Sequence, residues 1–383
     1  MTGPKIRVLH VLDSFDLGGA QEVVANLLAC VDRDTFDLEV ASMHRHGVYS
    51  QRFRTLGASI HSLSPHKLLP LYVPNLLRLL GRFDIVHTHL TASNLIAKPL
   101  AALVRTPVLI NHDHANDVSR RDRKLLCAAD RWTNRFSSHI CAVSQSTRRF
   151  LVEEEHIGPA KVTVVHNGID LQRFVPGQVS KEEARRSFNL PTEGHCLAGV
   201  GRLTPQKNFS LLLETAALLR KRRSDFFVAL AGTGLLEPAL RQQCAELGLD
   251  NIVHFLGHIE DTSRLYPALD LLVMPSLFEG LPMVLLEAMA MRVPMVASAV
   301  DGIAEVVADG REGVLLSGWD AENFCREIHV LLDDAPRRQV LTDAASNKVQ
   351  RQFSRESMTR NIEDIYKKCL TAAPGGTRMR PAA

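Results

Sequence analysis

Two carboxylates, Glu279 and Glu287, stand in the otherwise almost wholly apolar run FEGLPMVLLEAMA, residues 278–290. Burying an ionised carboxylate without a partner is costly, so each needs a polar neighbour or a ligand. The preceding run, LDLLVMP, predicts a buried strand, and Leu281-Pro282 predicts the start of a helix. Glu279 would then lie at the carboxyl end of a strand, where open α/β sheets bind ligands.

This arrangement suits a phosphorylated sugar. The unsatisfied N–H groups at the start of a helix favour an anionic phosphate. A glutamate further along the helix, such as Glu287, can accept hydrogen bonds from sugar hydroxyls. The alternative is structural: Glu279 caps the helix, and Glu287 pairs with a lysine.

Two cations, Arg202 and Lys207, occur in GVGRLTPQKNFSLLL, between a predicted strand and a predicted helix. Both can turn into the crevice at the end of that strand. Two fixed cations there would neutralise a diphosphate and stabilise the charge that grows on it as a bond breaks. The alternative is a pair of exposed loop charges.

A glycine pair, Gly18-Gly19, follows the first predicted strand in DLGGAQEVV. Glycines at such a turn let backbone N–H groups approach a phosphate or a sugar. The signal is weak alone, because a tight strand–helix turn also favours glycine.

Two histidines, His112 and His114, come at the end of the predicted strand PVLIN. Because a strand alternates its faces, both would share one face if the strand continues. They could form a metal pair, but no third ligand follows at a characteristic spacing. They could instead donate to a substrate hydroxyl or be tied to their own neighbours.

Composition excludes several classes of protein. The net charge of +3 over 383 residues is too small to indicate nucleic-acid binding. Seven scattered cysteines, with no C-x-x-C pair, indicate reduced thiols in a cytoplasmic protein. No apolar run reaches 18 residues, so no membrane span is expected. Residues 98–149 hold ten Lys/Arg and four Asp/Glu, which indicates either a solvated helical face or contact with an anionic surface.

The elements that must position these residues form two successive series of alternating strands and helices. Such alternation predicts parallel sheets, and two series predict two doubly wound α/β domains that face a cleft. We expect domains over residues 1–175 and 176–353, a terminal amphipathic helix over 354–372 and a disordered tail over 373–383. The expected strands are 6–12, 37–42, 84–89, 107–111, 139–144 and 162–167, then 196–201, 226–232, 251–257, 269–275, 294–299 and 313–318.

Together these motifs resemble the retaining glycosyltransferases of family 4, which include bacterial lipopolysaccharide, capsule and exopolysaccharide enzymes. The most specific match is E-x7-E, Glu279 to Glu287. The other matches follow in the family's order over residues 5–370: GGAQE, HNGID, GRLTPQKN, GHIED, PSLFEGLP and VDGIAEVVADGREGVLL. The resemblance implies the GT-B architecture, with two Rossmann-like domains and a C-terminal helix that crosses back to the first.

The resemblance also implies roles in holding the nucleotide. Arg202 and Lys207 would bind the donor diphosphate, and Glu287 would accept from the ribose hydroxyls. The backbone near His258 and Ile259 would meet the base.

On the sugar side, the resemblance places Glu279 beside the transferred sugar, with the amides of Gly280 and Leu281 on its hydroxyls or phosphate. Gly18 and Gly19 would approach the phosphate or the acceptor from the first domain.

The family's first-domain histidine, which contacts the donor sugar, corresponds to either His112 or His114, and we favour His114. The catalytic set expected from the resemblance is therefore Glu279, Arg202, Lys207 and His114.

The implied activity is retaining, metal-independent transfer of a sugar from a UDP-, GDP- or ADP-sugar to a hydroxyl of a glycan or lipid acceptor. No metal and no cofactor beyond the donor is expected, because fixed cations would take the place of a metal. An acceptor on an anionic lipid would bring residues 98–149 to the inner face of the cytoplasmic membrane. The alternatives are a sugar-nucleotide 2-epimerase and a non-catalytic sugar-nucleotide-binding protein.

Overall fold

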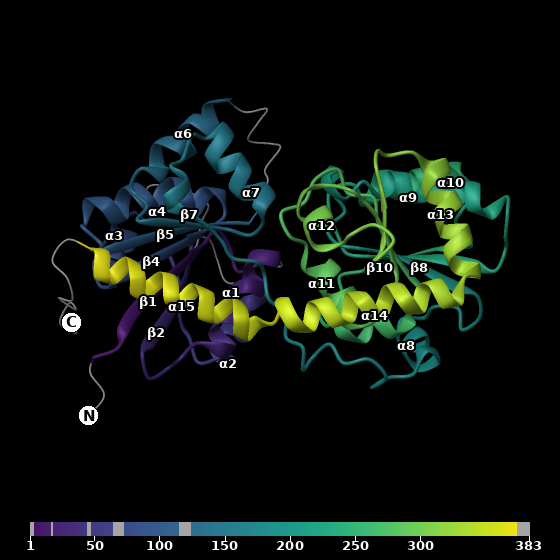
Figure 1. Cartoon of the computed structure of the whole chain (residues 1–383), viewed down its shortest axis with the longest axis horizontal. Helices are drawn as coiled ribbons and strands as arrows, with labels where there is room; N and C mark the ends of the chain where they lie inside the picture. The colour runs from purple at the N-terminus through teal and green to yellow at the C-terminus, as the bar shows by residue number, and fades with distance from the viewer. Residues whose placement is uncertain (1–3, 17, 44–46, 64–72, 115–123, 374–383) are drawn as a thin grey trace. The chain divides into compact units, whose positions relative to one another are not determined.

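The chain forms two compact units, which Figure 1 shows coloured along the sequence. Unit 1 comprises residues 1–169 and 355–383, and unit 2 comprises residues 170–354. The computed structural model describes residues 4–16, 18–43, 47–63, 73–114 and 124–373.

Unit 1 is built on a seven-stranded sheet in which every neighbouring pair of strands is parallel. The lateral order is β3-β2-β1-β4-β5-β6-β7. The inner strands are buried along most of their length, as a sheet covered on both faces requires. The strands are β1 (Ile6–Leu12), β2 (Phe36–Ser42), β3 (Ser59–Ser62), β4 (Ile85–His89), β5 (Val108–Asp113), β6 (His139–Ala142) and β7 (Val162–Val164).

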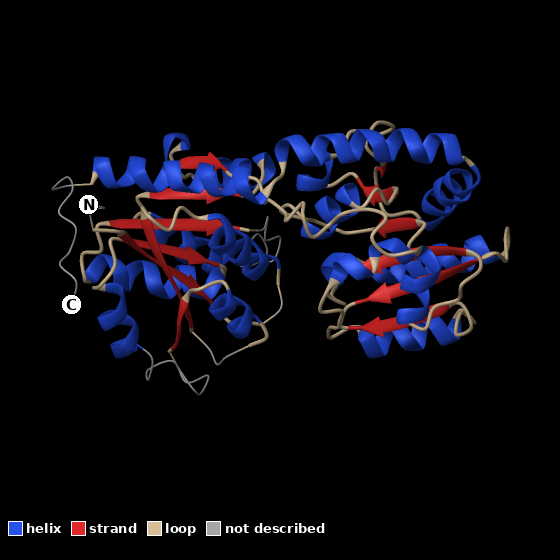
Figure 2. Cartoon of the chain, turned by 90° about the horizontal axis from the view of Figure 1, so that it is seen from below, coloured by secondary structure: helices blue, strands red, loops and turns tan. Residues whose placement is uncertain are grey.

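Helices flank the sheet of unit 1, as Figure 2 shows. The last helix, α15, belongs to this unit although it follows all of unit 2 in the sequence, and it packs against α1. The expected return of the C-terminal helix to the first domain is therefore confirmed. The helices of unit 1 are α1 (Gly19–Cys30), α2 (Tyr49–Thr55), α3 (Val73–Leu80), α4 (Thr91–Leu103), α6 (Lys124–Asn134), α7 (Gln145–Arg149) and α15 (Arg355–Ala372).

Unit 2 repeats the architecture with a six-stranded parallel sheet in the order β10-β9-β8-β11-β12-β13. Its strands are β8 (His195–Val200), β9 (Phe226–Ala231), β10 (Val253–Gly257), β11 (Leu271–Met274), β12 (Met295–Ser298) and β13 (Val314–Leu316). Its helices are α8 (Lys181–Ser187), α9 (Phe209–Arg220), α10 (Glu237–Glu246), α11 (Met283–Ala290), α12 (Asp301–Val306), α13 (Ala321–Asp333) and α14 (Ala335–Gln352).

Both sheets are doubly wound, and each reverses its strand order once. The reversal lies between β1 and β4 in unit 1 and between β8 and β11 in unit 2. Ligands of open α/β sheets bind at such points, outside the carboxyl ends of the strands. Five candidate residues lie in or beside the segments that follow β1, β8 and β11, namely Gly18, Gly19, Arg202, Lys207 and Glu279.

The predicted fold class is confirmed, and all twelve expected strands are present. One strand, β3, was missed. The domain limits expected at residues 175 and 353 remain predictions, and positions 374–383 of the expected tail lie outside the described residues. Within the part of the chain that the structure describes, no helix combines the length and the apolarity that crossing a membrane requires.

Candidate functional site

The loops after β8 and β11 meet at the point where the sheet of unit 2 reverses its order. The two strands are hydrogen-bonded neighbours, so their carboxyl ends lie side by side. Lys207 ends a 3₁₀ turn, Pro205–Lys207, in the first loop, and Glu279 lies in the second. The Leu277 N–H donates to the carbonyl of Gln206 at 2.8 Å and ties the two loops together.

Glu279 is the centre of this cluster and is only 4% exposed. The Lys207 ammonium lies 2.5 Å from one carboxylate oxygen, and the Ser276 hydroxyl donates to the same oxygen at 2.8 Å. The Gln206 amide donates to the other oxygen at 3.3 Å. The carboxylate is therefore fixed in place and compensated in charge. Glu279 does not cap α11, whose N-cap is Pro282, so that structural alternative is wrong.

The start of α12 supports Glu279 from the other side. The Glu279 backbone N–H donates to the carboxylate of Asp301 at 3.2 Å. Asp301 has a positive φ of 39°, which is uncommon for a residue with a side chain and is typical of functional sites. A Cβ on the next residue, Gly302, would lie 1.7 Å from the carbonyl oxygen of Gly280. Only glycine permits this approach.

The stem of Lys207 rests on Gly201, whose φ is 143°. A Cβ at Gly201 would lie 3.1 Å from Cε of the lysine. Gly232, at the end of β9, packs still closer, since a Cβ there would lie 1.9 Å from the Gly201 carbonyl oxygen. Gly232 and Gly234 thus pack against the loop that carries Lys207.

Glu287 lies inside α11 and is 7% exposed. The hydroxyls of Tyr266 and Thr262 both donate to one of its carboxylate oxygens, at 2.8 and 3.1 Å. Burial, reinforced by the neighbouring carboxylate, raises the pKa of Tyr266 well above its usual value. The tyrosine therefore remains a donor and orients the carboxylate.

The other predicted residues of unit 2 lie near the carboxyl ends of strands and differ in exposure. Arg202 follows β8 and His258 follows β10, and both are exposed. Ile259 is half-buried, whereas Gly280 and Leu281 are buried directly before α11. Among the described residues, Lys207 and Glu279 form an ion pair, and no hydrogen bond or ion pair joins Arg202 to either of them.

In unit 1, Gly18 and Gly19 lie between β1 and α1, as expected. Gly18 is extended, with φ 179°, but a Cβ there would lie 2.5 Å from Oε1 of Gln21. Gln21 in turn donates to the Ser14 carbonyl at 2.9 Å. A glycine here leaves room for the end of the Gln21 side chain, which is flexible and could shift, so this packing favours glycine without requiring it.

The two candidate histidines share one face, as the strand alternation predicted. The rings of His112 and His114 stack with centroids 4.4 Å apart. His112 is fully buried, whereas His114 is partly exposed and shares a 2.9 Å hydrogen bond with His89 of β4. Of the two, His114 is the one that a substrate could reach.

The basic segment 98–149 is less uniform than its charge suggests. Lys98 is fully buried in α4, where its ammonium donates to Asp130 at 3.0 Å and to Asn134 at 2.6 Å. Lys98 therefore cannot meet an anionic surface, which corrects its inclusion in such a face. Positions 115–123 of the segment lie outside the described residues.

The sequence analysis missed five residues that hold the two glutamates. None of them was assigned a role, although three fall within matched motifs and two follow the motif GHIED. They are Gln206, Thr262, Tyr266, Ser276 and Asp301.

Two family models match the chain, one for each unit. The model of glycosyltransferase family 4 matches residues 17–173. The model of glycosyl transferases group 1 matches residues 180–348.

Curated relatives cover most of the chain. EpsF of Bacillus subtilis, to which glycosyltransferase activity is ascribed, is 30% identical over 321 residues, which is 81% of this chain and 83% of EpsF. The UDP-Gal:alpha-D-GlcNAc-diphosphoundecaprenol alpha-1,3-galactosyltransferase of Escherichia coli is 24% identical over 381 residues, with 95% and 97% coverage.

Solved structures share the fold. The crystal structure of Anabaena HepE in complex with UDP-glucose has a TM-score of 0.86 at 20% identity, and the match covers 95% of this chain and 100% of HepE. The sucrose-phosphate synthase of Thermosynechococcus elongatus has a TM-score of 0.81 at 18% identity, with 96% and 100% coverage.

Proposed function

This chain belongs to glycosyltransferase family 4, and from that premise we propose that it transfers a hexose from a nucleoside-diphosphate sugar to an acceptor hydroxyl. The acceptor is a glycan or a lipid-linked glycan of a bacterial lipopolysaccharide, capsule or exopolysaccharide. Transfer retains the anomeric configuration and uses no metal. The alternative activities, a 2-epimerase and a non-catalytic binding protein, are disfavoured by the family membership.

The observation that carries the proposal is the Lys207–Glu279 pair at the reversal point of the sheet of unit 2. An ammonium has three N–H groups, and one of them satisfies Glu279. The remaining two are available to phosphate oxygens of a donor. A carboxylate held this firmly can accept from sugar hydroxyls without moving.

The mechanism follows from the charges. As the sugar–phosphate bond breaks, positive charge grows on the anomeric carbon and negative charge on the departing diphosphate. Lys207 and Arg202 stabilise the diphosphate. The N-terminus of α11, which carries a partial positive charge and directly follows the loop of Glu279, adds to this stabilisation. The acceptor hydroxyl attacks from the face that the diphosphate leaves, which retains the configuration. These fixed cations thus neutralise the departing diphosphate, a role for which other transferases use a metal ion.

The remaining roles concern recognition. Glu287, oriented by Tyr266, accepts from the ribose hydroxyls, and the backbone at His258 and Ile259 meets the base. The amides of Gly280 and Leu281 hold the sugar or its phosphate. In unit 1, Gly18 and Gly19 approach the phosphate or the acceptor, and His114 contacts the sugar.

Relatives support the substrate classes. HepE was solved with UDP-glucose, and the Escherichia coli galactosyltransferase uses a UDP-sugar and a diphosphoundecaprenol-linked acceptor, as their names state. We therefore propose a UDP-hexose as the first donor to test, followed by GDP- and ADP-sugars, and a lipid-linked acceptor.

A lipid-linked acceptor would bring unit 1 to the inner face of the cytoplasmic membrane. Two packed helices, α4 and α6, expose the apolar side chains of Leu103 (71%), Leu125 (89%) and Trp132 (48%). Arg131 and Arg135 lie exposed on or beside the same part of α6. Exposed apolar groups interspersed with arginines are typical of a surface that docks on anionic lipid.

The decisive experiment compares Lys207→Ala with Lys221→Ala, which removes an exposed lysine at the end of α9. Both are incubated with UDP-, GDP- and ADP-sugars, and release of the nucleoside diphosphate is followed. We expect the first variant to lose at least about a hundredfold in turnover, the scale of one transition-state charge partner. The second should match the parent.

Near-normal turnover of Lys207→Ala, with its fold intact, would refute the assigned role. Product analysis separates the activities: interconverted sugars indicate an epimerase, and binding without turnover indicates a binding protein. Proton NMR of the product anomer tests retention, and activity in a chelator tests metal independence.

Membrane docking is tested separately by sedimentation with liposomes at low salt. The parent should prefer anionic over neutral vesicles, and Leu125→Ser combined with Trp132→Ser should weaken that preference about tenfold or more. Equal binding to both kinds of vesicle would reject the docking surface and leave the transferase activity untouched.

A further inference from the structure

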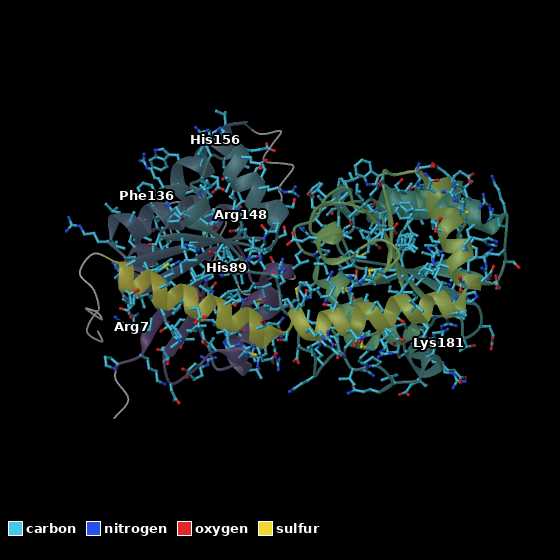
Figure 3. The ribbon with its side chains drawn as sticks, viewed as in Figure 1. Arg7, His89, Phe136, Arg148, His156 and Lys181 are labelled. Atoms are coloured by element: carbon cyan, nitrogen blue, oxygen red, sulfur yellow. The ribbon has the colours of Figure 1, made fainter. Side chains whose placement is uncertain are left out.

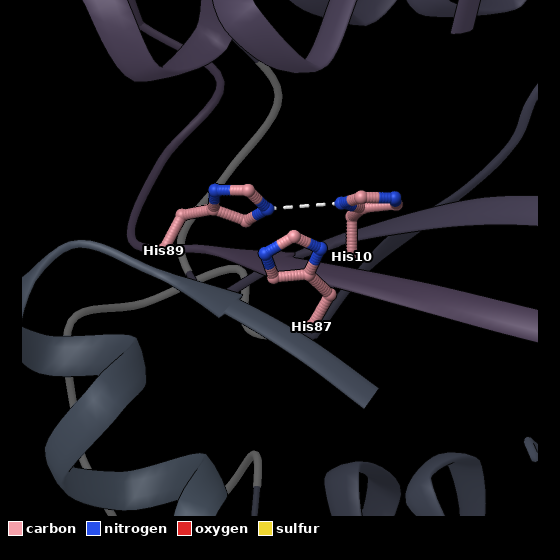
Figure 4. Close-up of side chains that lie close together, drawn as sticks. All are labelled: His10, His87 and His89. Atoms are coloured by element: carbon pink, nitrogen blue, oxygen red, sulfur yellow. Dashed lines mark hydrogen bonds between the residues drawn. The ribbon is translucent and has the colours of Figure 1, made fainter. Parts of the chain in front are cut away.

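Five histidines gather at the carboxyl ends of three adjacent strands in unit 1. They are His10 on β1, His87 and His89 on β4, and His112 and His114 at the end of β5. The register of the sheet sets His10 beside His87 and His89 beside His112. Figure 4 shows three of the rings at close range, and Figure 3 places His89 within the unit.

The first three rings are deeply buried: His10 and His87 are 0% exposed and His89 is 1% exposed. Desolvation lowers the pKa of His10 to about 3 and lowers the pKa of His87 and His89 well below the usual value. All three are therefore neutral near pH 7, and neutral imidazole is the form that coordinates metal ions.

In each of the three rings, one nitrogen is within hydrogen-bonding distance of a residue outside the set, which is here called its outer partner. Nδ1 of His87 lies 2.6 Å from the hydroxyl of Tyr366 on α15, and Nε2 of His10 lies 3.3 Å from the same hydroxyl. Nδ1 of His89 lies 2.9 Å from Nε2 of His114. The other nitrogen of each ring is here called its inner nitrogen. The inner nitrogens are Nδ1 of His10, Nε2 of His87 and Nε2 of His89.

The inner nitrogens are poorly satisfied by one another. Those of His10 and His89 share one hydrogen bond of 2.9 Å. Nε2 of His87 is buried and has no hydrogen-bond partner among the residues that the structure describes. A buried polar atom without a partner is costly and requires an explanation.

We propose that His10, His87 and His89 form a binding site for a first-row divalent transition metal ion, with Zn²⁺ as the representative case. The three side chains each offer a ligand atom within 4.8 Å of the others. Two ligands at about 2.0–2.1 Å from one Zn²⁺ lie at most about 4.2 Å apart, so a small side-chain adjustment suffices. Water or hydroxide takes the fourth position, as is usual where three histidines bind zinc.

The outer contacts strengthen this assignment. Histidines that ligate a metal almost always donate their other N–H to a second group, which fixes the tautomer and the ring. Here Tyr366 serves His10 and His87, and His114 serves His89. A second set, His89 with His112 and His114, also meets the distance limit. It is less suited, because His114 is partly exposed and the ring nitrogens of His112 have no outer partner in the described part of the chain.

The three proposed ligands are not among the residues assigned to the transfer chemistry, although His114, which supports His89, is also assigned to the donor sugar. The three ligands belong to unit 1, whereas the cations that bind the diphosphate belong to unit 2. The ion would link β1, β4 and, through Tyr366, α15. A metal ion that stabilises unit 1 is compatible with a transfer step that uses no metal. Either proposal can therefore be refuted without refuting the other.

The test uses the full chain, stripped with a chelator and titrated with Zn²⁺ against a chromophoric competitor. We expect one ion per chain with a dissociation constant below about 1 µM. Substitution by Co²⁺ should give visible bands typical of four-coordinate nitrogen and oxygen ligation. An upward shift of the melting temperature that grows with free Zn²⁺ should accompany binding, because the ion binds only the folded state.

Variants identify the ligands. His87→Gln should lose the site, and Tyr366→Phe should retain it with affinity reduced about 10–100-fold, the scale for an outer partner. The matched control is His254→Gln in unit 2, whose Nε2 is also buried without a partner in the described structure. This control should bind Zn²⁺ as the parent does.

Absence of stoichiometric binding by the folded parent would overturn the proposal. So would an unchanged Co²⁺ spectrum in His87→Gln and His89→Gln, or equal loss in the His254→Gln control, since either result would show adventitious binding by other histidines. If His87→Gln does not fold, the parent spectrum and the Tyr366→Phe affinity still decide the outcome.

Discussion

At the level of single residues, the interior of unit 1 holds a complete polar network around Lys98. Its ammonium donates to Asp130 and Asn134, and the Asn134 amide donates to Glu155 at 3.1 Å. Desolvation lowers the pKa of Lys98, and the nearby carboxylates oppose that shift. The network fastens α4 to α6 and to the end of the π-helical turn Phe150–Glu154, which follows α7.

Replacing Lys98 by Met should therefore destabilise unit 1 by about 3–5 kcal/mol, because it leaves the carboxylate of Asp130 buried without its cation. Denaturant unfolding measures the loss. The second substitution Asp130→Asn should restore part of it. As control, Lys181→Met breaks a pair in which the lysine side chain is 48% exposed, and it should cost no more than about 1 kcal/mol.

The role of a residue could be predicted from the sequence where a single motif indicates it. Contacts between residues of two different motifs could not be predicted. Glu279 and Lys207 were each identified, but their ion pair joins positions 72 residues apart. Ser276, Gln206 and Asp301 were unassigned because isolated polar residues are common and only the fold brings these three to Glu279. Lys98 was misassigned because charge counts along a sequence do not reveal burial.

At the level of elements, the loops of unit 2 are held by backbone contacts that only glycines allow. Gly302, at the start of α12, packs closely against the carbonyl group of Gly280, which belongs to the loop that carries Glu279. The approach leaves no room for a Cβ, and the obstructing atom is backbone. The position of the carboxylate thus depends on a residue without a side chain.

Gly302→Ala should displace the Glu279 loop, with a loss of about 1–3 kcal/mol in the stability of unit 2 and of about a hundredfold in turnover. Calorimetry and steady-state assays measure the two effects. Gly158→Ala is the matched control, because φ is −56° and nothing lies within 4 Å of the added carbon. Full activity of Gly302→Ala would show that the loop tolerates the shift.

Elements were predictable wherever apolar runs recur with turns between them, which is why both sheets were expected. The exception, β3, reads SIHS, and its four residues are half-buried or exposed. An edge strand of this kind lacks the apolar pattern by which buried strands are recognised. The strand β5 also runs further than expected, through His112 and Asp113, and so brings the histidines into the sheet.

At the level of the whole molecule, the two units differ in how they respond to acid. Among the described residues, six histidines of unit 1 and two of unit 2 have a pKa below the usual value, mainly because burial disfavours the charged ring. For His10 and His114 the pKa falls to about 3. Tyr366 packs against this group and has a raised pKa, so it stays neutral and cannot offset proton uptake.

Unit 1 should therefore lose stability as the pH falls below 6.5, because the unfolded chain binds protons there that the folded unit does not. Each such group contributes up to about 1.4 kcal/mol per pH unit until its folded pKa is reached. Hydrogen exchange in the presence of a chelator, at pH 7.5 and pH 5, should show β1 and β4 losing protection before β8 and β11. Equal loss in both units would contradict this assignment.

The place of α15 in the chain has a consequence for biosynthesis. Tyr366 meets His10 across 356 positions, and all of residues 170–354 emerge from the ribosome between them. Domains of a nascent polypeptide commonly complete their folding in the order in which they are translated. Here unit 2, although it is translated later, can complete its folding first, because unit 1 cannot complete its folding until α15 has been translated.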